Sequence, residues 1–202
     1  MKKAIIALGL ALSLMMTGQA IRAEEAGNLL KNPGFEDIEP YTVPEKWQQR
    51  AKAPEMPTWW GINLWAYPGN LTVIYDAITS HSGSKYVKVE GYRTRKQGGA
   101  HLFYTERPAV SPDKRYIIKV WAKGKGAISL GFYGYSKAWG GGKFIPGFGS
   151  GWMEVNSPDN WKEYKFEFDV KSKPEIKALS VYFGVTGTIY LDDAYFGVLS
   201  AK

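Results

Sequence analysis

The carboxylates best placed for metal chemistry lie near the two ends of the chain. Glu36 follows Gly34 in the segment 28–37, and the pair Asp192-Asp193 interrupts an otherwise apolar strand. Calcium binds six to eight oxygen atoms, which come from carboxylates and from backbone carbonyls in loops. Two interpretations stay open. Either these carboxylates hold calcium, or one Asp faces water, the other caps a turn and Glu36 lies on the surface.

Aromatic side chains are the most abundant groups suited to binding. The chain has 9 Phe, 8 Trp and 13 Tyr, more than its core requires. A sugar ring packs its C–H face on an aromatic ring, while its hydroxyls pair with polar side chains. Strand alternation turns four suitable residues outward, namely Lys88, Trp121, Tyr133 and Tyr182. Loop tryptophans can add platforms, although at least two of them are expected only to anchor their loops: Trp59, Trp60, Trp65 and Trp139.

Trp121 is the most informative of the outward residues. Its neighbours on the same face of the expected strand, Lys119 and Lys123, are charged. A core position is therefore less favoured for Trp121 than for Val120. The alternative is that Trp121 packs under a covering loop.

Enzyme chemistry has little support in the sequence. Both histidines, His81 and His101, are expected to be structural. The chain contains neither a Gly-x-Ser-x-Gly nor a His-Glu-x-x-His motif. Glu163 and Glu167 would lie about 13 Å apart along one strand at ~3.3 Å per residue, whereas glycoside hydrolysis uses carboxylates ~5 to 9 Å apart. We therefore predict that the protein is not an enzyme.

The elements that must position these residues are strands. Apolar residues recur with period two, and Gly or Pro interrupts before a helical period develops. In the clearest strand, 115–123, one face carries Tyr116, Ile118, Val120 and Ala122, which we expect in the core. Other strands are expected over 86–90, 127–135, 161–170, 177–185 and 188–199, with weaker candidates over 47–51, 59–64, 71–75 and 100–105.

Turns and loops separate these strands. Turn signals fall at 82–83, 111–113, 123–126, 157–159 and Gly187, while 37–58 and 135–152 read as long loops. This spacing predicts an all-β sandwich or barrel without substantial helix.

The N-terminus indicates export. Lys2 and Lys3 precede an apolar run over 4–16 and then small residues, which is the pattern of a secretory signal peptide. We assign residues 1–23 to this signal, with cleavage after Ala20 or Ala23, and 24–202 to a single domain. The apolar run is shorter than the ~20 residues of a membrane span. The expected location is therefore secreted or periplasmic in a bacterium, with no membrane span after signal removal.

Charge and cysteine content exclude further classes. Three of the net +7 charges, those of Lys2, Lys3 and Arg22, leave with the signal peptide. The mild remainder, together with export, makes nucleic acid an unexpected partner. The chain has no cysteine, which removes disulfides, zinc thiolate sites and cysteine nucleophiles.

Three segments, taken together and in order, resemble a known family. They are NLLKNPGFED at 28–37, HSGSKYVKV at 81–89 and IYLDDA at 189–194. This arrangement resembles the carbohydrate-binding modules of the families 4, 9, 16 and 22 type, which are jelly-roll sandwiches of the galactose-binding-like group. The resemblance spans nearly the whole mature chain, and 114–123 looks like the central strand of that family.

The resemblance implies a ligand groove and a metal site. Outward faces of this fold form a concave groove, which Lys88, Trp121, Tyr133 and Tyr182 would line. The family also implies a structural calcium ion, bound here by the residues Glu36, Asp192, Asp193, Gly34, Ser82 and Lys85 through carboxylates and carbonyls. Pro33 before Gly34 and the inserted Ser84 depart from the family pattern, which leaves the coordinating carbonyls open.

Our leading hypothesis is a secreted, noncatalytic module that acts alone and binds a polysaccharide or glycoconjugate. One alternative is an adhesion or interaction subunit of an envelope assembly that uses the same aromatic surface for protein. The other is a small jelly-roll polysaccharide lyase or hydrolase. The sequence specifies neither the sugar nor the oligomeric state.

Overall fold

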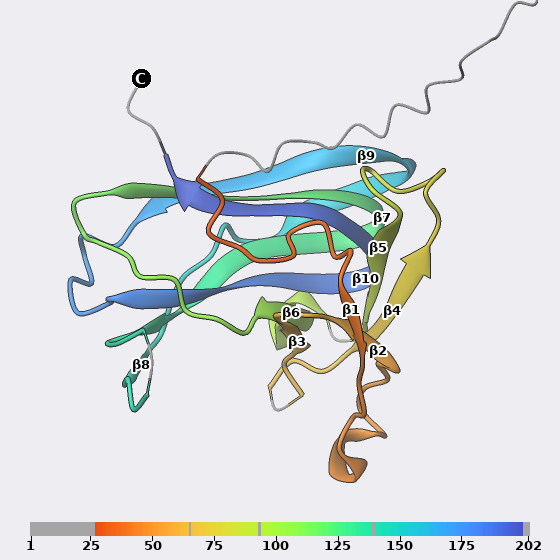
Figure 1. Ribbon diagram of the computed structural model, residues 1–202, viewed down its shortest axis with the longest axis horizontal. Helices are drawn as coiled ribbons and strands as arrows, with labels where there is room; N and C mark the ends of the chain where they lie inside the picture. Colours follow the sequence, from red (N-terminus) through yellow and green to blue (C-terminus); the bar gives the residue numbers. More distant parts are fainter. Residues whose placement is uncertain (1–26, 65, 93, 139, 200–202) are drawn as a thin grey trace, which may run out of the picture.

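The computed structural model describes residues 27–64, 66–92, 94–138 and 140–199 (Figure 1). The expected signal peptide lies outside these residues. The strands are β1 (Ile38–Pro40), β2 (Glu55–Pro57), β3 (Trp60–Ile62), β4 (Asn70–Tyr75), β5 (Lys85–Gly91), β6 (Ala100–Tyr104), β7 (Arg115–Tyr135), β8 (Phe144–Ile145), β9 (Met153–Asp169) and β10 (Ala178–Val198).

The all-β prediction is confirmed. In the described part of the chain the only helical elements are two 3-10 turns, η1 (Glu45–Trp47) and η2 (Arg95–Gln97). The strand expected at 47–51 is wrong, because the Trp47 N–H bonds back to the Pro44 carbonyl at 2.8 Å and closes a turn. None of the described segments forms a helix with the length and apolar character that crossing a membrane requires.

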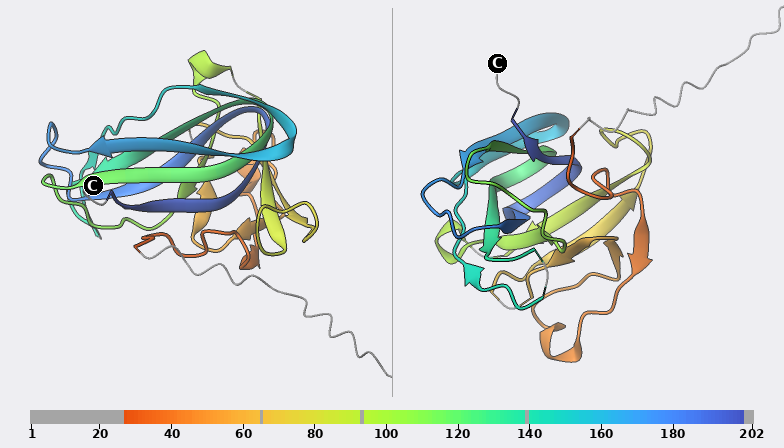
Figure 2. Two further views of the ribbon diagram at one scale, coloured as in Figure 1. Left: turned by 90° about the horizontal axis from the view of Figure 1, so that it is seen from above. Right: turned by 60° about the vertical axis from the view of Figure 1, so that its left-hand side comes forward.

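Three strands are much longer than the sequence predicts. β7, β9 and β10 run through the turns expected at 123–126, 157–159 and Gly187, where Gly126 pairs with Gly187. Gly126 has φ of 150°, and a Cβ there would lie 1.9 Å from the Thr186 carbonyl oxygen. Glycine therefore lets the strands stay paired while they bend. All three curve back at this point (Figure 2, left).

The bend divides the curled sheet into two layers. The first layer consists of β4, β5 and the halves of the long strands at 115–122, 162–169 and 188–198. The second layer is β3, β6, β8 and the halves at 126–135, 153–157 and 178–187. β5 and β6 lie end to end along one edge of β10, since Gly91 pairs opposite Gly187 and Ala100 opposite Val185. The predicted β-sandwich is thus confirmed.

The core lies between the two layers. Phe132 of the second layer stacks on Phe168 of the first with ring centroids 4.7 Å apart. The inward face predicted for 115–123 is confirmed, because Tyr116, Ile118, Val120 and Ala122 are all buried. Buried strands lined in this way hold the outer side chains in fixed positions.

The N-terminal segment lies beside the end of β10. The Leu29 N–H bonds to the Phe196 carbonyl at 2.7 Å, and the Ala194 N–H bonds to the Pro33 carbonyl at 2.8 Å. A register shift between Asp192 and Tyr195 interrupts the pairing of β10 with β7 at this place. Glu36 and Asp193 are thereby brought to the same turn, residues 81–85, as the contacts below show.

Candidate functional site

Six rings form a continuous row on the outer face of the second layer. Centroids of successive rings are 3.9, 4.3, 4.9, 6.2 and 6.0 Å apart. The aromatic row, as we call it, consists in this order of Tyr67, His101, Tyr182, Tyr133, Phe144 and Tyr135.

Strand register explains why these rings meet. β6, β10 and β7 are neighbours, with Gly184 opposite His101 and Gly131 opposite Tyr182. A Cβ on Gly131 would lie 2.5 Å from the Tyr182 hydroxyl oxygen, so the tyrosine ring lies directly over this glycine. Glycines on the outer face thus make room for the large rings beside them.

His101 is the centre of the row. It stacks between Tyr67 and Tyr182, and its Nδ1 lies 2.6 Å from the Tyr133 hydroxyl. The same hydroxyl accepts a hydrogen bond from the Asn63 amide at 3.1 Å. Burial lowers the pKa of His101 to about 4 and raises the pKa of Tyr133. Both groups are therefore neutral at physiological pH.

We expect His101 to make stability depend on pH. The unfolded chain takes up a proton near pH 6.5, whereas the folded chain does so only near pH 4. The stabilising contribution of neutral His101 is fully present above pH 6.5 and is lost as the pH falls toward 4. The loss between pH 7.5 and pH 5 is about 2 kcal/mol.

The measurement is urea unfolding of wild type and His101→Gln over this pH range. Because glutamine does not titrate, the variant is expected to lose about 2 kcal/mol less than wild type between the two pH values. Parallel pH profiles of the two proteins would contradict the assignment.

The aromatic row combines apolar and polar recognition groups. Phe144 is 54% exposed, while Tyr133, Tyr182 and Tyr67 are partly buried. Tyrosine hydroxyls and the Asn63 amide supply hydrogen-bonding groups along the same face. This is the pairing of ring surface and hydroxyl partners that sugar binding requires.

The expected common groove does not form. Tyr133 and Tyr182 lie side by side in the aromatic row, but Trp121 and Lys88 lie on the outer face of the first layer. The reason is the bend at Gly124 and Gly126, which places the two halves of β7 in different layers. Sequence alternation alone treats all outward residues as one face.

Trp121 packs under a loop, as the alternative interpretation stated. His81, from the connection between β4 and β5, stacks on the Trp121 ring with centroids 3.8 Å apart. Lys88 forms an ion pair with Glu90 at 3.3 Å. Nearby, the ammonium of Lys123 donates to the Thr79 carbonyl at 2.8 Å and lies 4.5 Å from the Trp161 ring centroid. The protein's own groups thus cover much of this face.

Two of the four loop tryptophans lie among the described residues, and their positions differ. Trp60 is 3% exposed, and its indole N–H donates to the Asn32 carbonyl at 3.2 Å. It is a core residue, and the platform role expected for it is wrong, because β3 turns this ring inward. Trp59 is 42% exposed with the Lys31 ammonium 4.1 Å above its ring. Trp139 lies outside the described residues, as does Trp65.

The predicted metal-binding carboxylates surround the 81–85 turn. Fully buried Asp192 accepts hydrogen bonds from the backbone N–H groups of His81, Ser82 and Asp193 at 2.9, 3.1 and 2.8 Å. Burial and the neighbouring Asp193 carboxylate raise the pKa of Asp192 to about 8, although these three donors oppose the shift. Asp193 accepts from the Ser82 hydroxyl at 2.6 Å, and its other oxygen lies 2.5 Å from His81 Nδ1.

Glu36 is held by the other end of the same turn. One carboxylate oxygen accepts from the backbone N–H groups of Ser84 and Lys85 at 2.8 and 3.0 Å, and the second accepts from the Ser84 hydroxyl. The Lys85 ammonium donates to the Glu36 carbonyl at 2.7 Å. Gly34 lies close to both the Glu36 and the Asp193 side chains, since a Cβ there would be 3.6 Å from an Asp193 carboxylate oxygen.

This donor set does not fit calcium as arranged. Each carboxylate oxygen of Glu36, Asp192 and Asp193 faces an N–H or O–H donor or the His81 ring nitrogen, and no three such side chains within the described ranges converge on a metal position. Calcium would have to displace these donors with carbonyl oxygens. Calcium binding stays a prediction from the sequence.

Comparison with known proteins identifies the family. Residues 27–188 match the family model CBM_4_9, described as a carbohydrate binding domain. The chain belongs to this family of carbohydrate-binding modules. No curated protein matches it significantly.

One solved structure agrees with the fold of the module. It is a protein of Bacteroides thetaiotaomicron whose sugar-binding role is itself only inferred. That protein is 14% identical to this chain with a TM-score of 0.54, and the match covers 85% of this chain and 100% of that one. A module titled "CBM4 structure and function" is also 14% identical, with a TM-score of 0.46 and coverage of 84% and 99%. The enzymatically active domain of bacteriophage CBA120 tailspike protein 4 is 14% identical with a TM-score of 0.49 over 70% of this chain, which spans only 20% of that chain.

Sequence reasoning missed most of the aromatic row. It gave His101 a structural role and did not single out Tyr67, Asn63 or Phe144 as ligand candidates. The usable signal was alternation, which turns His101 to the opposite face from Leu102. Its place beside Tyr182 becomes visible only when β6 is known to pair with β10.

Proposed function

We propose that this carbohydrate-binding module is an exported, noncatalytic protein that holds a polysaccharide or glycoconjugate on the aromatic row. The observation that carries the proposal is the continuity of the row, in which six rings from β6, β7, β8, β10 and the 63–69 loop contact one another in sequence. A line of rings suits a chain of sugar units better than an isolated ring does. The family match supports carbohydrate as the ligand.

Neutral groups along the row favour a neutral or weakly charged ligand. The low pKa of His101 and the raised pKa of Tyr133 keep charge away from the centre of the row. Tyrosine hydroxyls can donate and accept, which matches the hydroxyls of sugars. Export is supported by the signal-like N-terminus in the sequence.

We expect Phe144→Ala to weaken glycan retention by about 1 to 3 kcal/mol, using the range for rings that stack on nucleic-acid bases as a proxy. Phe144 is 54% exposed, so its loss should change the melting temperature little. The measurement is affinity electrophoresis in gels that contain xylan, galactan or other soluble polysaccharides.

Two control variants separate this row from other aromatic surfaces. Tyr92→Ala removes a ring that is 66% exposed outside the row, and Trp121→Ala removes the ring under His81. Both should retain glycan as wild type does, provided that they stay folded. Weaker retention in these variants, with Phe144→Ala unchanged, would move the site to the first layer and contradict the proposal.

A further inference from the structure

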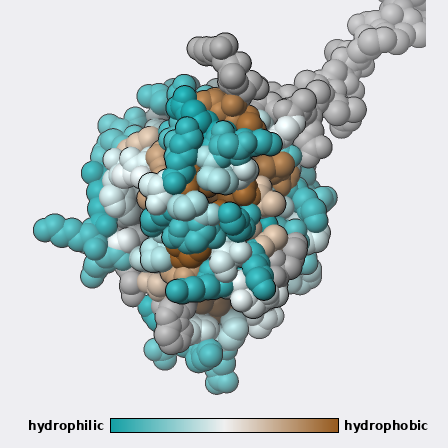
Figure 3. Space-filling model, turned by 90° about the vertical axis from the view of Figure 1, so that its left-hand side faces the viewer, coloured by the Kyte–Doolittle hydropathy of each residue, from teal (hydrophilic) through white to brown (hydrophobic). Residues whose placement is uncertain are grey.

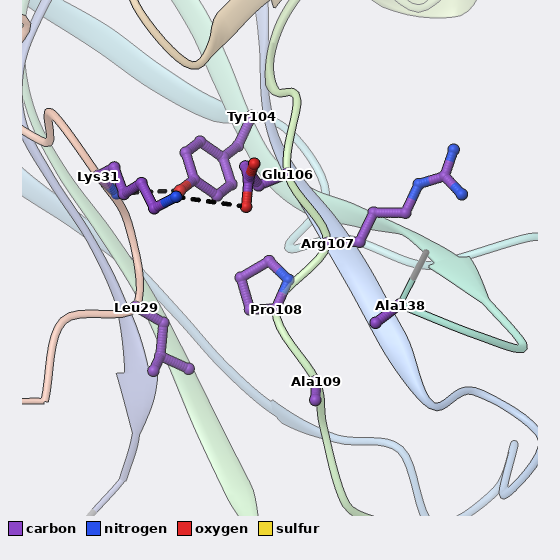
Figure 4. A pocket seen from close by; sticks show the side chains of 8 residues that line it. All are labelled: Leu29, Lys31, Tyr104, Glu106, Arg107, Pro108, Ala109 and Ala138. Atoms are coloured by element: carbon purple, nitrogen blue, oxygen red, sulfur yellow. Dashed lines mark hydrogen bonds and ion pairs between the residues drawn. The ribbon is translucent and has the colours of Figure 1, made fainter. Parts of the chain in front are cut away.

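A pocket of about 400 Å³ lies beside the end of the aromatic row (Figure 4). Leu29 and Lys31 of the N-terminal segment form one side, and Glu106, Arg107 and Ala109 form the other. Its volume is near the lower end of the ~300 to 1,000 Å³ that is usual for small-molecule sites.

The pocket has an apolar side and a polar end. The Lys31 ammonium lies 3.7 Å from a Glu106 carboxylate oxygen, and the Tyr104 hydroxyl accepts a hydrogen bond from the Lys31 backbone N–H at 3.0 Å. Figure 4 shows the side chains of Lys31 and Glu106 approaching each other beside the Tyr104 ring. The ammonium can donate and the carboxylate can accept, as vicinal hydroxyls of one sugar ring require.

Apolar surface accompanies this polar end. Leu29 lines the pocket and is 40% exposed, and Trp59, under the Lys31 ammonium, is 42% exposed. Figure 3, which views the end of the molecule that carries β8, shows hydrophobic patches between hydrophilic side chains. A ligand with both ring faces and hydroxyls fits this mixture.

Arg107 connects the pocket to the aromatic row. It lines the pocket, and its guanidinium carbon lies 3.6 Å from the centroid of Tyr135, the last ring of the row. Figure 4 shows its side chain pointing away from Lys31 and Glu106. A chain that follows the row toward Tyr135 therefore reaches the pocket at Arg107.

We propose that the pocket binds the terminal sugar of a glycan whose chain lies along the aromatic row. This inference rests on the proposed function and adds that the module recognises chain ends. Lys31 and Glu106 hold hydroxyls of the terminal sugar, and Leu29 contacts its ring.

The stoichiometry of binding tests this inference on the wild-type protein. Xylan and galactan fragments fractionated by length, and fragments of any other polysaccharide that is retained, are titrated into the module by calorimetry. The number of modules bound per chain should stay constant as the chain lengthens. A number that rises with chain length would show binding along the chain and overturn this inference, while leaving the proposed function intact.

Variants test the pocket itself. Ala109→Trp places a ring at an exposed position on the pocket wall and should weaken fragment binding at least tenfold, and Glu106→Gln at least threefold. Glu163→Trp adds the same ring at an exposed position of β9 in the first layer and serves as the control. Unchanged binding in both pocket variants would overturn the inference. Failure of wild type to bind any glycan would instead overturn the proposed function, and this inference with it.

Discussion

Replacing Trp60 with alanine is expected to lower the free energy of unfolding by about 3 to 5 kcal/mol, the range for large aromatic residues in cores. Trp60 is 3% exposed and contacts three other rings, with centroids 5.0 Å from Phe35, 5.4 Å from Tyr104 and 5.5 Å from Phe183. Alanine leaves a cavity between the N-terminal segment and the second layer. For a domain of this size the melting temperature should fall by roughly 6 to 20 °C.

The neighbouring tryptophan supplies the matched control. Trp59→Ala removes the same ring from a position that is 42% exposed and should cost less than about 1 kcal/mol. Denaturant unfolding followed by circular dichroism measures both changes. Equal losses in the two variants would show that the burial of Trp60 is not what stabilises this region.

We expect Asp192→Ala to lose at least about 3 kcal/mol, because each buried donor left without a partner costs ~1 to 3 kcal/mol. The carboxylate accepts three backbone hydrogen bonds, two of them from the 81–85 turn. Without it, the N–H groups of His81 and Ser82 lose their acceptor. The turn that carries His81 against Trp121 should loosen at the same time.

Asp192→Asn and Glu163→Ala delimit this effect. The asparagine keeps one acceptor oxygen and should lose less than the alanine variant, while Glu163 lies exposed on β9 and its replacement should change stability by under ~0.5 kcal/mol. Unfolding is measured in the presence of a chelator, so that no metal contributes. An Asp192→Ala protein as stable as wild type would mean that the turn does not depend on this carboxylate.

Local alternation was sufficient to predict which faces of the main strands are buried, although not the lengths of β7, β9 and β10 or the turn at 47–51. Val120 and Ile118 are buried and Glu163 is exposed as predicted, because burial on one face of a strand is a property of near neighbours in sequence. The three segments 28–37, 81–89 and 189–194 were sufficient to identify the family. Both results depend on short-range patterns.

The candidate site depends on long-range geometry that the sequence does not display. Gly124, Gly126 and Gly187 were read as turns, yet they are bends within paired strands. That difference separates Trp121 from Tyr182 and removes the predicted groove. Likewise, Trp59 and Trp60 are adjacent in sequence, and only the pairing of β3 with β6 determines which one is buried.

The continuity of β7, β9 and β10 through both layers has a consequence for how the protein folds. Each of these three strands has one half in each layer. Neither layer can therefore form a stable subdomain, and the two layers should unfold as one cooperative unit. β10 pairs with β5, β6 and β7, and its end also bonds to the segment 29–33. Most of these contacts join residues distant in sequence, which slows folding. The sheet can therefore close only once residues 178–198 are available to pair with β5, β6 and β7.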